Sequence, residues 1–467
     1  MQIFRQSLSK TKPAKLILLV GLAVLLFAYT IPWVAENSGD KDYSGIDFHG
    51  YWYAGHYVRA GVNSYAAILN GPSFPIYWDP RIPGSGVPYR LGIRFGDFES
   101  ALKLPIYYLD GRVVTDYPVA QVLIVAPSAT APLGLFLGLF SWFSWNIART
   151  IWIVLNIIFA ALIPWLGMRL IDQRQRMNMV DQLILAMTFY NFYGLRQSTV
   201  VGQQTLICLF LLMLALLLKD RWLVAGILLG FGISKYSVGL PVFLFFLLQR
   251  KYRIILVGLI VQAVGLLLLM PLEKGSLLET VKAYLKVFDL NYSQTGVHLL
   301  AQFAEIPLAG YLMVLVILVV TIYLVGGDYL SRKRPGGNEP ALQLNHLNIL
   351  TLGVFLAAYH RIHDMPFMIF FFLATTAVLV RDQKPTQNEG RLITASQWLL
   401  TAMLVLPNIG TKVVSYAGLP AGVVERIASA DAISTLALLV MFALSAWFQL
   451  AALSDSKPVT RKINQTA

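Results

Sequence analysis

Long apolar runs, separated by short polar breaks, occupy most of this chain. A helix that crosses a bilayer needs about 20 mainly apolar residues. Runs of this kind, some of them shorter, occur at 15–34, 145–170, 180–198, 202–218, 222–234, 237–249, 253–271, 309–327, 343–359, 365–380, 396–416 and 431–453. The pattern predicts an all-α polytopic membrane protein with about 12 transmembrane helices.

Two of the predicted helices, 222–234 and 237–249, are too short to cross a bilayer upright. About 13 residues of helix cover only about 20 Å. We therefore expect a hairpin of half-length or tilted helices with Lys235 at its apex. Unwound backbone at such a depth is tolerated only beside a cavity.

The run 118–140 is long enough to cross, but Pro127 and Pro132 interrupt it and no basic residues follow it. Counting it as a span would place the basic cluster from Arg169 to Arg176 outside. Cytoplasmic loops are the ones enriched in Lys and Arg, so this placement is disfavoured. We expect the run to lie in the outer interface or half inside the bilayer.

These assignments give one transmembrane domain in four parts. We expect a large outer loop with interfacial helices at 36–144, a core helical bundle at 145–272, a second outer loop at 273–308 and C-terminal helices at 309–453. Within the first loop, two β-prone runs flank Asp110 and Gly111 and predict a small β-hairpin.

Composition agrees with a membrane protein. The chain is 57% hydrophobic and 13% charged, with a mean hydropathy of +0.63. Its net charge of +13 comes from Lys and Arg at the ends of apolar runs, which indicates topology and no nucleic-acid partner. Both termini are expected inside, with the first run an uncleaved span. The single cysteine, Cys208, provides neither a disulfide framework nor a thiolate metal site within one chain.

Asp47 lies shortly beyond the first span, on its outer side, and aromatic residues follow it, among them Tyr51 and Trp52. Tyr and Trp favour the headgroup level because each combines an apolar body with a polar edge. An acid in this place either caps a helix or takes part in catalysis.

Lys235 falls near the middle of apolar sequence. A lysine at a helix centre costs about 2.5–3.5 kcal/mol on insertion scales. It either extends to the interface or pairs with an anion, and a lipid phosphate is the functional candidate.

The sequence YHRIHD, 359–364, forms a tight outer turn between two predicted spans and crowds His360, Arg361, His363 and Asp364 together. Two histidines and an arginine suit a phosphate clamp, although such turns are often merely solvated. A metal site is less favoured because spacing fixes no third, distant ligand. We expect no metal and no cofactor.

The sequence LRQSTVVGQQ places Arg196, Gln197, Gln203 and Gln204 at the outer end of a hairpin between two spans. Such side chains either hydrogen-bond sugar hydroxyls or cap helices.

Together these pieces resemble the C-type (GT-C) integral membrane glycosyltransferases, and in particular glycosyltransferase family 87, the polyprenol-phosphate-mannose-dependent mannosyltransferase-like group. In chain order, the matching positions are Asp47, Phe48, Tyr51, Ala54, Gly61 and Tyr65; Tyr117 and Pro118; Gly202 and Gln203; Gly226, Gly230, Gly232 and Lys235; and His360, Arg361 and Asp364. The second proline of the family's Tyr-Pro-Pro is Val119 here, and the Asn of its Gly-Gln-x-Asn is Thr205.

The resemblance implies a GT-C-like fold and an inverting transfer of mannose or another hexose or pentose. The donor would be a polyprenyl-phosphate sugar and the acceptor a lipid or glycan, on the non-cytoplasmic face of the plasma (inner) membrane. Asp47 would be the general base. The donor phosphate would contact Lys235, His360 and Arg361, and the substrates would contact Tyr51, Tyr117, Arg196, Gln203, His363 and Asp364.

Two other classes stay open. A transporter or flippase of lipid-linked sugars would also need many spans and buried cations, but it usually shows repeated halves, and no repeat is visible here. A lipid-carrier polymerase or ligase usually has its catalytic outer loop late in the chain, whereas the larger loop here follows the first span.

Overall fold

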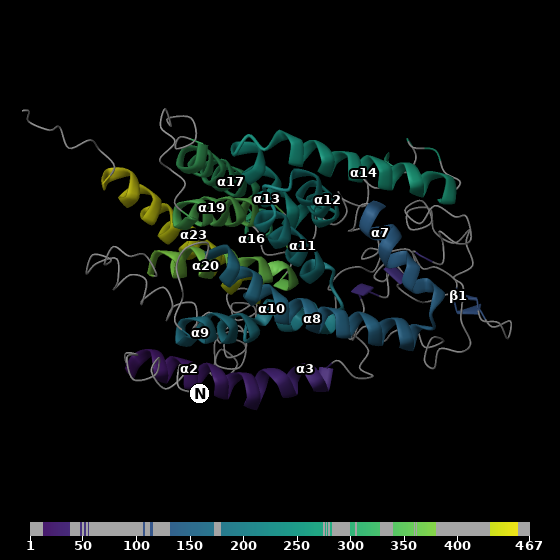
Figure 1. The fold of residues 1–467 in the computed structure, drawn as a ribbon, viewed down its shortest axis with the longest axis horizontal. Helices are drawn as coiled ribbons and strands as arrows, with labels where there is room; N and C mark the ends of the chain where they lie inside the picture. Colours follow the sequence, from purple (N-terminus) through teal and green to yellow (C-terminus); the bar gives the residue numbers. More distant parts are fainter. Residues whose placement is uncertain are drawn as a thin grey trace, which may run out of the picture.

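The computed structural model describes residues 13–37, 47–48, 51–52, 55, 106–107, 113–114, 131–171, 179–273, 276, 278, 281–282, 299–303, 306–326, 340–358, 360, 362–379 and 430–455. The helices in these ranges are arranged mainly side by side along one common direction (Figure 1).

The first span is a continuous helical segment with a π-helical turn in its middle. It consists of α2 (Pro13–Leu25), the π-helix η1 (Leu26–Thr30) and α3 (Ile31–Asn37). Near its N-terminal end Lys15 pairs with Asp181 at 2.6 Å, which ties the span to α9 (Met179–Tyr190).

In the described ranges, four helical segments are long and apolar enough to cross a membrane: Lys15–Glu36, Ile147–Ile171, Tyr252–Leu272 and Leu308–Gly326. The last three belong to α8 (Trp145–Ile171), α14 (Tyr252–Glu273), and α17 (Pro307–Thr321) with the π-helix η4 (Ile322–Gly326). A fifth is obtained if α10 (Tyr193–Val201) and α11 (Thr205–Leu217), which bend by 116°, count as one broken span.

The expected count of about 12 spans is therefore not confirmed. Helices do form at most predicted positions, but α11, α12 (Trp222–Gly232) and α13 (Tyr236–Leu248) have only 13, 11 and 13 residues. Helices of this length fall short of the hydrocarbon thickness. Further along the chain lie α16 (Leu299–Gln302), α19 (Pro340–Ala357), the 3-10 helix η5 (Ile362–Met368), α20 (Ile369–Leu379) and α23 (Ala430–Asp455). The predicted span 396–416 lies outside the described residues.

The short helices α12 and α13 meet at a break that contains Lys235, at the apex of the predicted hairpin. Small residues let α12 pack closely on α14. A Cβ atom added at Gly226 or at Gly230 would lie 2.5 Å from Cβ of Val257 or Val261. This close approach fixes the direction of α12 and with it the position of Lys235.

Part of the segment predicted to be interfacial forms α7 (Ala131–Gly138) and the 3-10 helix η3 (Leu139–Trp142). Figure 1 shows α7 inclined to α8 and α14, at the same end of the molecule as β1. Strands β1 (Ile106–Tyr107) and β2 (Val113–Val114) pair antiparallel, with Ile106 opposite Val114. The turn between them and most of the predicted outer loop lie outside the described residues.

A cluster of buried aromatic side chains surrounds the segment that carries Asp47. Phe48 stacks on Trp152 of α8 at 4.9 Å between ring centroids and meets Phe140 edge-on at 5.4 Å. Tyr51 and Trp52 are each 1% exposed, so their rings face other side chains of the protein, and their expected place at the headgroup level stays a prediction. Their rings pack into the protein because α7, η3 and α8 supply an apolar surface next to them.

Candidate functional site

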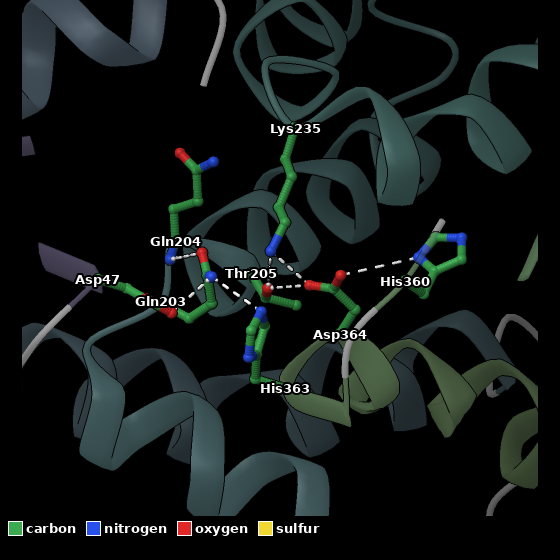
Figure 2. A network of polar contacts seen from close by, with 8 residues as sticks. All are labelled: Asp47, Gln203, Gln204, Thr205, Lys235, His360, His363 and Asp364. Carbon is green, nitrogen blue, oxygen red and sulfur yellow. Dashed lines mark hydrogen bonds and ion pairs between the residues drawn. The ribbon is translucent and has the colours of Figure 1, made fainter. Parts of the chain in front are cut away.

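Asp47 lies inside the protein and is held by a side chain from a distant part of the sequence. Its Oδ2 atom accepts a hydrogen bond of 2.7 Å from Nε2 of Gln203, and the two residues are 5% and 3% exposed. Figure 2 shows this contact at one end of a chain of polar side chains that continues through Gln203 to His363.

Gln203 is positioned by the bend between α10 and α11. Helix α10 ends at Val201 and is capped by Gly202, whose φ of 72° and ψ of 35° lie in the left-handed region that glycine adopts without strain. The backbone N–H of Gln203 then donates to the Ser198 carbonyl oxygen at 2.9 Å, and the Trp152 indole donates to the Gly202 carbonyl oxygen at 2.8 Å. The bend therefore turns Gln203 toward Asp47 and η5.

The orientation of the Gln203 amide follows from its partners. Its Oε1 accepts the backbone N–H of Gln204 at 3.1 Å, so Nε2 is the atom facing Asp47 and His363. Nε2 of His363 lies 2.9 Å from the same nitrogen. Because an amide nitrogen only donates, His363 must accept here, which requires a neutral ring with its hydrogen on Nδ1.

A second set of contacts joins Lys235 to Asp364 of η5. The two form a buried ion pair, with side chains 5% and 2% exposed. Thr205, the first residue of α11, bridges them: its hydroxyl accepts from Lys235 Nζ at 2.9 Å and donates to Asp364 Oδ1 at 2.7 Å. Lys235 thus neither extends to the interface nor stays unpaired, and its charge is compensated inside the protein.

His360 completes this cluster from the opposite side of Asp364. Its Nδ1 lies 3.7 Å from Asp364 Oδ2, and its ring stacks on Phe355 at 3.7 Å between centroids. Burial lowers the pKa of His360, and the nearby Asp364 carboxylate only partly opposes this. The ring is therefore neutral at pH 7.

The pKa of Asp364 is set by opposing effects. Burial raises it, but the Lys235 ammonium, with smaller contributions from the nearby His360 and His363 rings, outweighs burial and holds the pKa well below its usual range. Asp364 is therefore a carboxylate at pH 7, which preserves the ion pair with Lys235.

The structure brings together six of the residues selected from the sequence, and Figure 2 shows all of them. They are Asp47, Gln203, Lys235, His360, His363 and Asp364. Tyr51 lies in the aromatic cluster around Phe48. Arg196 contacts the rings of Tyr29, Trp33 and Tyr193. Tyr117 and Arg361 lie outside the described residues.

Thr205 was missed as a site residue. The signal available in the sequence was its position, because it replaces the Asn of the Gly-Gln-x-Asn motif directly after the helix bend. A hydroxyl that both donates and accepts can occupy that position and join a cation to a carboxylate. Within the described ranges, no three His, Cys, Asp or Glu side chains gather as metal ligands would.

Apolar helices of membrane-crossing length, around a buried cluster of carboxylates, amides and cationic side chains, define a helical membrane protein with an internal polar site. The model of glycosyltransferase family 87 matches residues 117–381, more than half of the chain. The chain therefore belongs to this family, as its motifs suggested, and is a glycosyltransferase that takes a sugar donor and an acceptor. No curated protein and no solved structure gives a match. The matched residues include Gln203, Lys235 and Asp364, while Asp47 precedes them.

Proposed function

We propose that the protein transfers a sugar, with inversion, from a polyprenyl-phosphate donor to a hydroxyl of a lipid or glycan on the non-cytoplasmic face of the plasma membrane. The observation that carries this proposal is the buried carboxylate of Asp47, held by Gln203 at 2.7 Å beside residues of the family's other motifs. Both termini would lie in the cytoplasm. Mannose is one candidate among the hexoses and pentoses.

Asp47 is proposed as the general base. The acceptor O–H bond breaks and its proton passes to the Asp47 carboxylate, while the acceptor oxygen bonds to the anomeric carbon. The bond from that carbon to the phosphate oxygen breaks on the opposite face, and polyprenyl phosphate leaves with the electron pair. One carboxylate is enough, because a phosphate monoester is a better leaving group than the sugar alcohol that glycosidases must protonate.

Gln203 supports this role by fixing the direction of the Asp47 carboxylate. Its two N–H groups are directed at Asp47 and at His363, and its oxygen is held by the Gln204 backbone. A base must lie within hydrogen-bonding reach of the proton it removes, so a fixed carboxylate saves reorganisation during the reaction.

Lys235, His360 and Arg361 are proposed to hold the donor phosphate. A lysine ammonium has three N–H donors, and Asp364 and Thr205 take two of those of Lys235. The third suits a phosphate oxygen. Because Asp364 already compensates the charge of Lys235, the developing charge on the leaving group needs further cationic groups. Arg361 is proposed as one of these cationic groups because of its place in the family's His/Arg/Asp turn.

The remaining residues are proposed to contact the substrates. His363 is only half buried, whereas Asp364 is 2% exposed, so His363 is the member of η5 best placed to reach a sugar hydroxyl. Tyr51, Tyr117, Arg196 and Gln203 complete the proposed set. The proposed reaction uses no metal or organic cofactor, because the base is a carboxylate and the leaving group is a phosphate ester.

The test is direct. Purified protein in nanodiscs is incubated with candidate polyprenyl-phosphate sugars and an acceptor extract, and released polyprenyl phosphate is measured. Release that depends on acceptor supports the proposal. In sealed proteoliposomes, movement of intact donor across the bilayer without release would favour a transporter or flippase. Growth of a lipid-linked chain would favour a polymerase or ligase.

A further inference from the structure

Arg196 of α10 is a buried cation held by aromatic rings. Its side chain is 2% exposed. The guanidinium carbon lies 4.8 Å from the ring centroid of Tyr29, 5.4 Å from that of Trp33 and 5.4 Å from that of Tyr193. The first two rings come from the first span and the third from one turn earlier in α10. We call these four residues the Arg196 cage.

The cage satisfies only part of the hydrogen-bonding groups of the guanidinium, through the Tyr29 side chain. Ring faces attract the positive charge, but they offer no lone pair to the N–H groups in the guanidinium plane. Nε and Nη1 of Arg196 are buried and have no hydrogen-bond partner among the described residues. Of the ion pairs found in the described ranges, none includes Arg196. The guanidinium therefore has two unsatisfied nitrogens and no carboxylate partner among the described ion pairs.

This arrangement contrasts with that of Lys235, the other buried cation of the site. Lys235 is paired with Asp364, and Thr205 bridges the two (Figure 2). An incoming anion gains little net charge attraction at Lys235 because the pair is neutral. Arg196 keeps its full charge in the low-dielectric interior, where attraction for an anion is strongest.

The helix opposite Arg196 departs from regular geometry at the same level. Tyr29 lies in η1, the π-helical turn of the first span, and π-helical turns inside α-helices are frequent at functional sites. Thr30 of this turn donates to Asn191 Oδ1 at 2.8 Å, and Asn191 Nδ2 donates to the Leu22 carbonyl oxygen at 2.9 Å. These buried bonds fix the π-helical turn against the break between α9 and α10. The first span, which supplies two rings of the cage, is thus tied to the segment that leads into α10.

The position of the cage indicates which anion it would take. Tyr29 is 37% exposed, on a span whose apolar side chains face outward, so the cage opens toward the lipid through this ring. Arg196 precedes Val201, the end of α10, by about 8 Å of helix, and Gln203 follows shortly after. An anion on a lipid chain reaches this place more readily than a soluble one. Arginine also matches phosphate oxygens through paired N–H donors.

We propose that the Arg196 cage binds the phosphate group of a membrane lipid, with Tyr29 turning aside to admit it. Two lipids share this chemistry, a polyprenyl phosphate and an anionic phospholipid. Only the polyprenyl-phosphate alternative rests on the proposed function, since a phospholipid would bind whatever the reaction.

The experiment uses full-length protein in nanodiscs of phosphatidylcholine, whose choline group masks the phosphate charge. Binding of a short polyprenyl phosphate and of phosphatidylglycerol is measured by native mass spectrometry. Arg196→Gln removes the charge and keeps a polar side chain, and we expect it to weaken binding of at least one lipid by about tenfold or more. Arg169→Gln is the matched control, because Arg169 also contacts a ring, Trp165 at 5.3 Å, but lies exposed at the other end of α8.

Each outcome has a meaning. Weaker binding of polyprenyl phosphate alone assigns the cage to the donor, and weaker binding of phosphatidylglycerol alone assigns it to a phospholipid. Unchanged affinity for both lipids overturns the proposal. If Arg196→Gln does not fold, Arg196→Lys keeps the charge but loses the planar donors, and Tyr29→Leu opens the cage; wild-type affinity in both would also overturn it.

The proposed function fails separately. Wild-type transfer by an Asp47→Asn enzyme that still binds lipid through Arg196 would contradict the proposed base and leave the cage proposal standing.

Discussion

Replacing one partner of the Lys235–Asp364 ion pair should destabilise the protein more than replacing both partners. Lys235→Met leaves the Asp364 carboxylate buried at 2% exposure without its cation, and Asp364→Leu leaves the Lys235 ammonium at 5% exposure without its anion. Removing one partner of a buried ion pair typically costs about 3–5 kcal/mol of stability. Replacing both with apolar groups of similar size is often neutral or stabilising.

Unfolding of the wild type, both single variants and the double variant Lys235→Met/Asp364→Leu can be compared in one detergent. We expect each single variant to lose about 3–5 kcal/mol and the double variant to recover most of the loss, which gives a large coupling energy. The double variant should not regain all of the lost stability, because the Thr205 hydroxyl loses both of its hydrogen-bond partners. Additive losses in the double variant would refute the reasoning, since they would mean that the two side chains are not in contact.

The same set of variants separates the effect on folding from the effect on donor binding. Lys235→Met alone cannot test the phosphate site, because loss of affinity and loss of stability would coincide. The double variant removes the cation from a folded protein. Weaker binding of a polyprenyl phosphate to it than to the wild type supports the role proposed for Lys235, and unchanged binding removes Lys235 from the donor site.

Three further predictions follow from the described contacts. Burial lowers the pKa of His360, so on acidification the histidine of the unfolded chain takes up a proton before that of the folded protein. The free energy of unfolding should therefore fall as the pH drops below about 6.5, by at most about 1.4 kcal/mol per pH unit. In thermal unfolding, His360→Gln should reduce this pH dependence. Gln203→Leu should lower kcat by about tenfold or more with little change in KM for the donor, while Gln203→Asn should restore part of kcat; equal kinetics for the Leu variant and the wild type would contradict the positioning role. A cysteine at Trp142, 70% exposed, should react with an impermeant maleimide from outside and one at Asp220 should not, with buried Cys208 giving no background; the opposite labelling would invert the topology.

The helices were accessible from sequence because apolar runs report helix positions directly. Both the long span at α8 and the break at Lys235 followed from run length. The number of spans could not be predicted in this way. An apolar run of 11 to 13 residues has the same composition in a helix that crosses the membrane and in a helix buried among others. The aromatic residues after Asp47 show the same ambiguity: Tyr51 and Trp52 have the composition of a headgroup belt, yet pack inside the protein.

The site was predictable as a set of charged residues in apolar surroundings, but its pairing was not. A lysine or a carboxylate in such a sequence signals a function or a partner. Which partner it meets depends on tertiary packing between distant segments, as with Lys235 and Asp364 or Gln203 and Asp47. The bridging role of Thr205 also depends on this packing, because a threonine at the start of a helix usually signals only a cap.

The central claim is that Asp47 removes the acceptor's proton, and Asp47→Asn tests it most directly. Asparagine can still accept the hydrogen bond from Gln203 through its side-chain oxygen, so fold and donor binding should survive. It cannot take up a proton, and loss of a general base typically slows a reaction by about 10²–10⁴-fold. The measurement is the rate of polyprenyl phosphate release with the donor that the wild-type enzyme uses. We predict a rate reduced to that extent with donor affinity unchanged. A near-wild-type rate would contradict the account and direct the search for the base to Asp42, Asp97, Asp116 or Asp364.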